Sequence, residues 1–255
     1  MRLLTYNIRE GGVGRAEQIA EVIKAAKPDV VALQEARVPE MVQRIAELAG
    51  FRFFGSRLAH SAGFLSNVPV LNFEWRQPRR TRHALLEVRL EEGCPRLFVV
   101  HLRAWFSNFT ERQRARELRG LLDGIQQQLI KEQNAFAFHL LAGDFNALAP
   151  GERLDPSPMP GWIRAMIWLS GRDIARSTIE MMKSEGYADA WRTLHSEQDG
   201  EPGYTFPVWN PHVRLDYVFT PRAYASRFIS CEVRGTPEEV RTASDHFPLL
   251  VEIST

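Results

Sequence analysis

Apolar residues in the first quarter of the chain follow two different spacings. Residues 2–8 (RLLTYNI) and residues 29–35 (DVVALQE) are short and almost uniformly apolar, which is typical of strands buried on both faces. Residues 15–27 instead repeat apolar side chains every three or four positions, and residues 39–49 do the same, opened by a proline and followed by a glycine. The pattern predicts two strands, each followed by a helix.

The spacing changes after residue 50, where short apolar runs follow one another with only short turns between them. Such a series is typical of antiparallel strands. The expected strands are residues 51–55, 63–67, 69–75, 83–90 and 96–103. A long helix is predicted from about residue 110 to about residue 133, with the sequence TERQ at 110–113 as its capping box.

The second half of the chain contains four further strand-like runs. These are residues 137–146, 214–220, 228–234 and 248–254. The least regular stretch is 149–175, which is rich in proline and glycine and briefly amphipathic near its end. Because helices and strands mix twice along the chain, we expect two sheets packed face to face, with helices on both outer sides. A chain of 255 residues can build this as one domain spanning 1–255.

Composition and charge narrow the class of protein. The formal net charge is only +1, so tight non-specific binding to nucleic acid through many phosphate contacts is not expected. This balance does not exclude a local groove lined by basic residues. Apolar runs stay below the ~18 residues of a membrane span, and the first residues suit a strand better than a signal peptide. We therefore expect a cytoplasmic protein with two reduced cysteines, a disulfide being the alternative.

Polar side chains stand where several of these apolar runs end or begin. Each has an ordinary explanation when taken alone, as a turn former, a helix cap or an ion-pair partner. Together they form a series of residue types that bind metals or transfer protons, placed at sheet edges where functional sites collect. The series is Asn7, Glu35, His101, Asp144, Asn146, Asp216, Asp245 and His246.

The short motifs around these residues occur in an order that resembles the endonuclease/exonuclease/phosphatase superfamily of DNase I-like proteins. The motifs are TYNI around Asn7, LQE ending at Glu35, HL at His101, GDFN at 143–146, RLDYVF around Asp216 and SDH at 244–246. They extend over residues 3–251, nearly the whole chain. The resemblance implies a four-layer α/β/β/α sandwich with two packed mixed or antiparallel sheets, and a site at one end of both sheets.

Phosphodiester hydrolysis explains why these residue types belong together. A hard cation, Mg²⁺ or Mn²⁺, neutralises the anionic substrate and prefers carboxylate ligands, so we assign Glu35 first, Asp245 second and Asn7 nearby. Asp144 and Asn146, two positions apart, are suited to orienting the attacking water. His246 is expected to face the phosphate as an imidazolium.

Two further expectations come from the resemblance. The carboxylate that holds the His246 ring is Asp216, and His101 contacts the phosphate from the other side. DNase I-like members also carry an acid that orients the first histidine. In this chain the corresponding stretch, AHSAGFLSN, has His60 and Ser61 instead of an acid, so the partner of His101 is left open.

Substrate choice is expected to depend on loops around the site. Candidate contacts are Arg103, Trp105, Trp209 and Arg82, and a tryptophan beside arginines could stack on a nucleobase. Residues 161–171 suit a lid, a lipid-facing helix or a cover for a sheet edge.

The sequence thus predicts a divalent-metal-dependent phosphoesterase, with a phosphodiesterase or nuclease ahead of other activities. Nucleic acid is somewhat favoured as substrate over small or lipid phosphodiesters. A phosphomonoesterase uses the same groups and is an alternative. A non-catalytic binding module is less favoured, because degenerate members of such a family would be expected to lose a ligand or a histidine.

Overall fold

The strands of the computed structural model form two six-stranded sheets. The description covers the whole chain except residues 79–80, 82, 133–136, 153, 172 and 197–201. The first sheet has the order β11-β12-β1-β2-β4-β3, and the second has the order β5-β6-β7-β8-β10-β9. The strands of the first are β1 (Arg2–Asn7), β2 (Val30–Gln34), β3 (Phe53–Gly55), β4 (Gly63–Ser66), β11 (Phe228–Val233) and β12 (Leu249–Ile253). Those of the second are β5 (Val70–Arg76), β6 (Leu85–Leu90), β7 (Arg96–His101), β8 (His139–Asp144), β9 (Tyr187–Asp189) and β10 (Asp216–Pro221).

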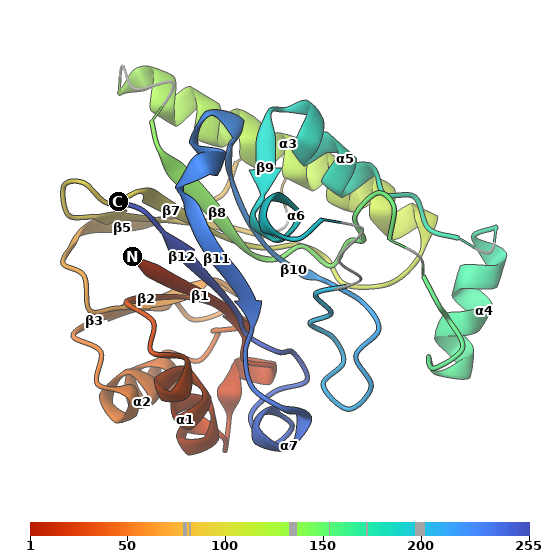
Figure 1. The fold of residues 1–255 in the computed structure, drawn as a ribbon, viewed down its shortest axis with the longest axis horizontal. Coiled ribbons are helices and arrows are strands. Elements are labelled where there is room, and N and C mark those ends of the chain that lie inside the picture. Colours follow the sequence, from red (N-terminus) through yellow and green to blue (C-terminus); the bar gives the residue numbers. More distant parts are fainter. Residues whose placement is uncertain (79–80, 82, 133–136, 153, 172, 197–201) are drawn as a thin grey trace.

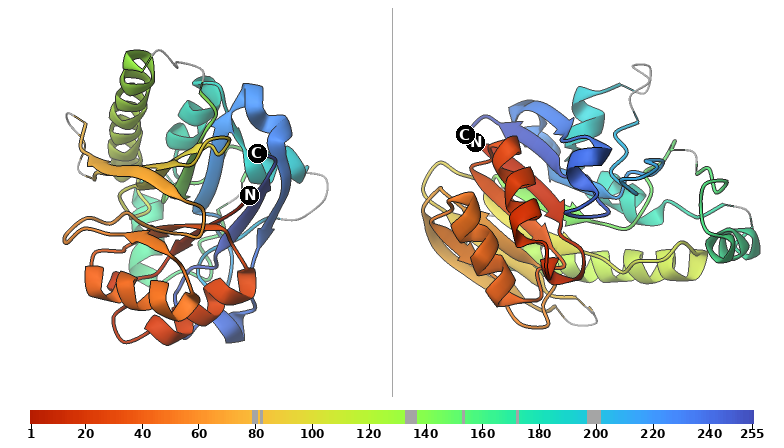
Figure 2. Two further views of the ribbon diagram at one scale, coloured as in Figure 1. Left: turned by 90° about the vertical axis from the view of Figure 1, so that its left-hand side faces the viewer. Right: turned by 90° about the horizontal axis from the view of Figure 1, so that it is seen from below.

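Helices cover the outer face of each sheet, which confirms the four-layer α/β/β/α sandwich. Helices α1 (Ala16–Ala26) and α2 (Pro39–Ala49) pack on the first sheet, and α3 (Asn108–Lys131) and α5 (Ser177–Ser184) pack on the second. Figure 2 shows the two pairs on opposite sides of the paired sheets, and the two termini close together. Apart from α4 (Gly161–Leu169), which is described below, the remaining described helices are α6 (Ala190–Leu194), α7 (Pro237–Val240) and two 3₁₀ segments, Glu10–Gly12 and Arg222–Arg227.

The apolar runs are nearly uniform because both faces of the sheets are buried. In β1, Leu3 lies in the core between the two sheets, whereas Leu4 and Tyr6 pack under α1 and α2. In β8, Leu140 and Leu141 divide in the same way between the inner core and the layer below α3. Each strand therefore needs apolar residues at consecutive positions, and this accounts for the pattern seen in the sequence.

The long helix begins earlier than the sequence predicted, and the predicted capping box was wrong. Ser107 is the N-cap, with extended backbone angles, and its hydroxyl accepts a hydrogen bond from the Thr110 backbone N–H. The Thr110 hydroxyl in turn accepts a hydrogen bond from the Ser107 backbone N–H. Thr110 is therefore the third helical residue rather than the cap. Two overlapping Ser/Thr patterns compete here, and only the backbone conformation at Ser107 decides between them.

Helix α4 (Gly161–Leu169) lies in the stretch expected to be least regular. Figures 1 and 2 show it standing apart from the sheets, beyond their ends, rather than along a sheet edge. Ile167 is its one buried residue, so the helix presents most of its surface to solvent. Within the described chain no helix combines the length and the apolar character needed to cross a membrane. Both cysteines, Cys94 and Cys231, are free thiols.

Candidate active site

Three polar residues meet in one row because their strands are neighbours in the second sheet. Asp144 at the end of β8 is in register with His101 of β7 and with Asp216 of β10. Strand β8 can approach β7 this closely because residue 143 is glycine: a Cβ there would lie 1.8 Å from the carbonyl oxygen of Val100. The glycine of the GDFN motif is therefore a steric requirement of the strand pairing.

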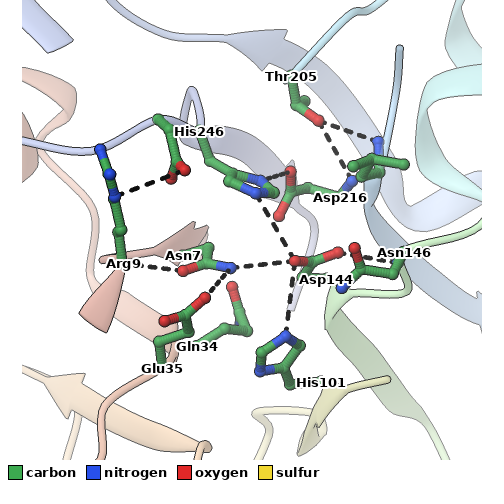
Figure 3. Close-up of polar contacts among 12 residues, drawn as sticks. Asn7, Arg9, Gln34, Glu35, His101, Asp144, Asn146, Thr205, Asp216 and His246 are labelled. Atoms are coloured by element: carbon green, nitrogen blue, oxygen red, sulfur yellow. Dashed lines mark hydrogen bonds and ion pairs between the residues drawn. The ribbon is translucent and has the colours of Figure 1, made fainter. Parts of the chain in front are cut away.

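The first sheet brings two more polar residues to the same end. Strands β1 and β2 are parallel and end together, with Asn7 in register with Gln34, and Glu35 follows directly. The Asn7 amide nitrogen donates to Asp144 Oδ2 in the other sheet at 3.0 Å and lies 3.5 Å from Glu35 Oε1. Figure 3 shows Asn7 between the two carboxylates. One side chain thus joins the two sheets at the site.

His246 is held by Asp216 and stands beside Asp144. Its Nδ1 donates to Asp216 Oδ2 at 2.9 Å, and its Nε2 lies 3.8 Å from Asp144 Oδ2 (Figure 3). Burial disfavours the charged imidazolium, but the carboxylates of Asp216 and Asp144 outweigh it and raise the pKa of His246 to about 10. The ring also packs against Phe206 at a centroid distance of 4.8 Å. His246 is a cation at neutral pH.

The surroundings of Asp144 disfavour its charged form. Complete burial and the nearby negative charge of Asp216 raise its pKa to about 7, although His246 and hydrogen bonds from Asn7 and from the Asn146 backbone N–H act against this. The Asn146 side-chain amide donates to the carbonyl of Leu102 at 3.1 Å, which fixes its orientation. A carboxyl group with a pKa near 7 can both accept and release a proton at physiological pH.

The partner of His101 is Ser61. The Ser61 hydroxyl forms a short hydrogen bond with His101 Nδ1 and also accepts the Glu35 backbone N–H at 3.0 Å. A serine hydroxyl can donate one hydrogen bond and accept two, so Ser61 can pair with either tautomer of the His101 ring while it accepts the Glu35 N–H. Burial, together with the positive fields of His83 and His246, lowers the pKa of His101 to about 4. At neutral pH the His101 ring is therefore uncharged, whereas the His246 ring is a cation.

Glu35 and Asp245 supply carboxylates on the first-sheet side. Burial opposes ionisation of Glu35, but the Glu10 backbone N–H, the Arg37 guanidinium and the Asn7 side-chain amide prevail and lower its pKa. Asp245 lies 3.7 Å from the Arg9 guanidinium. Both carboxylates line the same cavity. An ionised glutamate and a second carboxylate form the all-oxygen donor set that suits a hard divalent cation.

A second group of potential ligands is more deeply buried. Ligand atoms of Asp144, Asp216 and His246 lie within 4.8 Å of one another, close enough to surround an ion. In the described chain, Asp216 Oδ1 is buried without a hydrogen-bond partner. However, the Nδ1 of His246 is already bonded to Asp216, and Asp144 Oδ2 accepts from Asn7. These bonds suit proton transfer better than metal ligation.

The cavity of the site encloses about 260 Å³ and has a polar and an apolar half. The polar half contains Asn7, Glu35, His101, Asp144, Asn146, Asp245 and His246, and the apolar half contains Ala104, Trp105, Phe106, Trp162, Ile163, Phe206 and Leu215. A larger cavity of about 550 Å³ lies between α3 and the β5–β6 hairpin, away from these groups. We assign the site by its chemistry rather than by volume.

The structure describes three of the four predicted substrate contacts and places only one of them in the cavity lining. Trp105 lines the cavity. Trp209 is 64% exposed and packs against Phe206, outside the lining. Arg103 is half-buried and also outside the lining, with its carbonyl bound by Arg114. Arg82 lies outside the described residues.

Sequence reasoning missed several residues that shape the site. Thr205 accepts the backbone N–H groups of Leu215 and Asp216 and so anchors the start of β10. Nothing in the local sequence distinguishes this threonine from others. Ser61 occupies the position where an acid was sought, and a serine gives no signal by itself. Trp162 could have been found only by knowing that α4 reaches the cavity.

Comparisons with known proteins agree with this fold. The profile of the Endonuclease/Exonuclease/phosphatase family matches residues 4–246. Among solved structures, an AP endonuclease from Archaeoglobus fulgidus (17% identical, TM-score 0.71) and the 3'-5' exonuclease NExo from Neisseria meningitidis (16%, 0.70) are similar over all of both chains. TDP2 from D. rerio, complexed with a single-strand DNA product, is 20% identical with a TM-score of 0.65, over all of this chain and 99% of that one. No curated protein sequence matches this chain significantly.

Proposed function

The chain belongs to the endonuclease/exonuclease/phosphatase family, and we propose that it is a divalent-metal-dependent phosphodiesterase that hydrolyses a P–O bond by in-line attack of water. The observation that carries the proposal is the position of Asp144, whose Oδ2 lies 3.8 Å from the Nε2 atoms of both His101 and His246. A proton acceptor between a neutral and a cationic histidine is suited to activating water beside an anionic phosphoryl group.

Each residue has a role that follows from its contacts. Asp144, with its pKa near 7, takes the proton of the attacking water, and the Asn146 backbone N–H holds the carboxylate in place. His246, kept charged by Asp216, stabilises the negative charge that develops on the phosphoryl oxygens. His101 donates a hydrogen bond from Nε2 to the same group.

The metal would be held on the first-sheet side by Glu35 and Asp245, with Asn7 orienting Glu35 against Asp144. When bound, Mg²⁺ or Mn²⁺ supplies charge neutralisation at the phosphate and polarises the P–O bond. The lowered pKa of Glu35 supports this assignment, because the ligand must be ionised. Titration of Mn²⁺ into the protein tests it: Glu35→Gln weakens binding about tenfold or more, whereas Asp216→Asn leaves it unchanged. The reverse result would place the ion among Asp144, Asp216 and His246.

Nucleic acid is the substrate class that we favour. Similar structures include TDP2 with a single-strand DNA product and NExo, described as a 3' phosphatase bound to a product DNA hairpin. The second description keeps a phosphomonoesterase as the alternative. A panel of DNA, RNA, nucleotides, inositol phosphates and phospholipids, assayed with metal and then with chelator, separates these substrates. The two free thiols support a cytoplasmic location as part of the same proposal.

Activity on a simple diester tests the reaction itself. With Mg²⁺ or Mn²⁺ the protein is expected to hydrolyse bis-p-nitrophenyl phosphate, and chelation is expected to abolish the activity. Glu35→Gln should reduce turnover by at least about 10²-fold, as expected for loss of a metal ligand or of general acid–base catalysis. Glu40→Gln, an exposed change on α2, is the matched control. If the protein hydrolysed no phosphoester in the panel, the proposal would be refuted.

A further inference from the structure

Trp105 has a backbone conformation that tryptophan rarely adopts. Its φ is +96°, in the region that normally requires glycine. Residues held in such conformations concentrate at binding and catalytic sites, where the surrounding structure enforces them. The side chain lines the catalytic cavity and is 54% exposed, so it does not act as a plug in the core. The fold thus enforces an unfavourable backbone while leaving the indole ring accessible.

A buried ion pair enforces this conformation. The Trp105 carbonyl accepts hydrogen bonds from Arg114 Nη1 at 2.8 Å and from Thr110 Oγ1 at 2.9 Å, and Arg114 also binds the Arg103 carbonyl at 3.0 Å. Arg114 is buried and paired with the equally buried Glu111 at 2.8 Å. Charged side chains are rarely buried so completely unless they are paired with each other, as these two are. Here they hold the loop that carries Trp105.

Helix α4 brings a second tryptophan to the first. The rings of Trp105 and Trp162 are 5.2 Å apart at an interplanar angle of 58°, and Trp162 is also half-exposed, at 52%. The end of α4 is tied to the start of α3 by the Asn108 side chain, which donates to the Ser170 carbonyl at 2.7 Å. The tilted rings therefore belong to two anchored segments and form an open aromatic wall next to the catalytic groups.

The charges of the cavity lining limit which substrates can bind beside the two tryptophans. Among the described residues, neither lysine nor arginine lines the cavity, and its polar half contains one cationic histidine. A substrate with several phosphate groups on one small ring would need more cations than this. The group next to the single scissile phosphate must instead contact indole rings and aliphatic side chains, as flat aromatic rings do.

We infer that Trp105 and Trp162 form a subsite for one unpaired nucleobase, adjacent to the phosphodiester that is cleaved. The inference rests on the proposed phosphodiesterase activity. An unpaired base has free faces for stacking, whereas a base inside a duplex is stacked on both faces and paired along its edge. The substrate class is therefore single-stranded or terminal nucleotides rather than intact duplex. A lipid substrate is less well matched, because an acyl chain gains only non-directional apolar burial from the indole rings, whereas a flat base also gains the stacking that their orientation offers.

Two substrates with the same leaving group test the inference. One is the p-nitrophenyl ester of thymidine 3'- or 5'-monophosphate, and the other is methyl p-nitrophenyl phosphate, in which methyl replaces the nucleoside. Trp105→Ala and Trp162→Ala should raise KM for a thymidine ester by about 5- to 150-fold, the range for one stacked base. The KM for the methyl ester should rise far less, so that the ratio of the two KM values changes in both variants. Trp168→Ala, an exposed change on the same helix outside the cavity, is the control.

Each outcome has one meaning. Hydrolysis of the methyl ester by the variants shows that they are folded, and Trp105→Phe should recover most of the lost affinity because it restores an aromatic face. If neither ester is hydrolysed by the parent protein, the proposed activity fails. If both esters are hydrolysed but neither tryptophan variant changes their KM ratio, the subsite is refuted. Faster hydrolysis of phosphatidylcholine vesicles than of either thymidine ester would overturn it in favour of a lipid substrate.

Discussion

Asp216→Asn isolates the charge that keeps His246 protonated. The substitution preserves shape and can preserve a hydrogen bond to His246 Nδ1, now 2.9 Å from Asp216 Oδ2, but it removes the buried negative charge. Asp216 is the strongest of the groups that raise the pKa of His246 to about 10. Without it, burial works against the imidazolium with only Asp144 and Asp245 opposing. We expect the pKa of His246 in the variant to fall toward its ordinary value of about 6.5.

The size of the effect follows from the two pKa values. Between pH 6 and pH 8.5 the parent His246 is fully protonated, because its pKa is about 10. With a pKa of about 6.5, the protonated fraction in the variant falls to roughly 1/10 at pH 7.5 and 1/100 at pH 8.5. Ionisation alone therefore reduces turnover about tenfold at pH 7.5 and about 100-fold at pH 8.5. Above about pH 7.5 the ratio of parent to variant rates should grow about tenfold with each pH unit.

The assay is the pH profile of kcat for bis-p-nitrophenyl phosphate, taken as the ratio of parent to variant. The change in this ratio is compared between pH 7.5 and pH 8.5, where Asp144, whose pKa Asp216 also raises, is mostly ionised in both proteins. Thr205→Val is the matched control, since Thr205 accepts the Asp216 backbone N–H but carries no charge, and its rate ratio should not vary with pH. NMR titration of the His246 ring gives the pKa directly. A constant ratio between pH 6 and pH 8.5 for Asp216→Asn, or a His246 pKa still near 10, would refute the reasoning.

Three further predictions concern the scaffold. Gly143→Ala should destabilise the protein by at least about 3 kcal/mol in urea unfolding, because its Cβ would overlap the Val100 carbonyl; a loss below 1 kcal/mol would show that β7 and β8 can separate freely. Arg114→Met should cost about 3–5 kcal/mol by leaving Glu111 buried and unpaired, and adding Glu111→Gln should recover part of this; no recovery would contradict the ion-pair explanation. Burial lowers the pKa of His139 to about 4, so the unfolded chain binds this proton more readily and stability falls as pH drops below about 6.5. Between pH 7 and pH 5 the loss should be about 2 kcal/mol, and His139→Gln should remove that part of the pH dependence.

The resemblance to one family was sufficient to predict the architecture and to name every residue of the polar half of the cavity. Asn7, Glu35, His101, Asp144 and His246 stand in recognisable motifs, and the structure brings all of them to one cavity. Their chemical roles are still proposals. The motifs predict proximity because they lie at strand ends, and strand ends on one side of two packed sheets are close together.

Contacts between segments far apart in the chain were beyond the reach of local patterns. The pairing of His101 with Ser61 depends on how the loop before β4 meets the end of β7, which lies in the other sheet. The pairing of Trp105 with Trp162 depends on where α4 stands beyond the sheets. Neither a serine nor a tryptophan indicates from the sequence which residue it will contact. Sequence reasoning therefore left the partner of His101 open and did not identify Trp162 as the partner of Trp105.

What the sequence determined by itself was the type and order of the main elements, because burial on one face or two imposes a spacing of apolar residues that can be read along the chain. Only the tertiary structure decided the charge states of the two histidines. Those depend on which carboxylates, hydroxyls and cations lie within a few ångströms of each ring after burial. Strand register and loop conformation set these distances, and residues more than 100 positions apart, such as Asp144 and His246, supply the contacts.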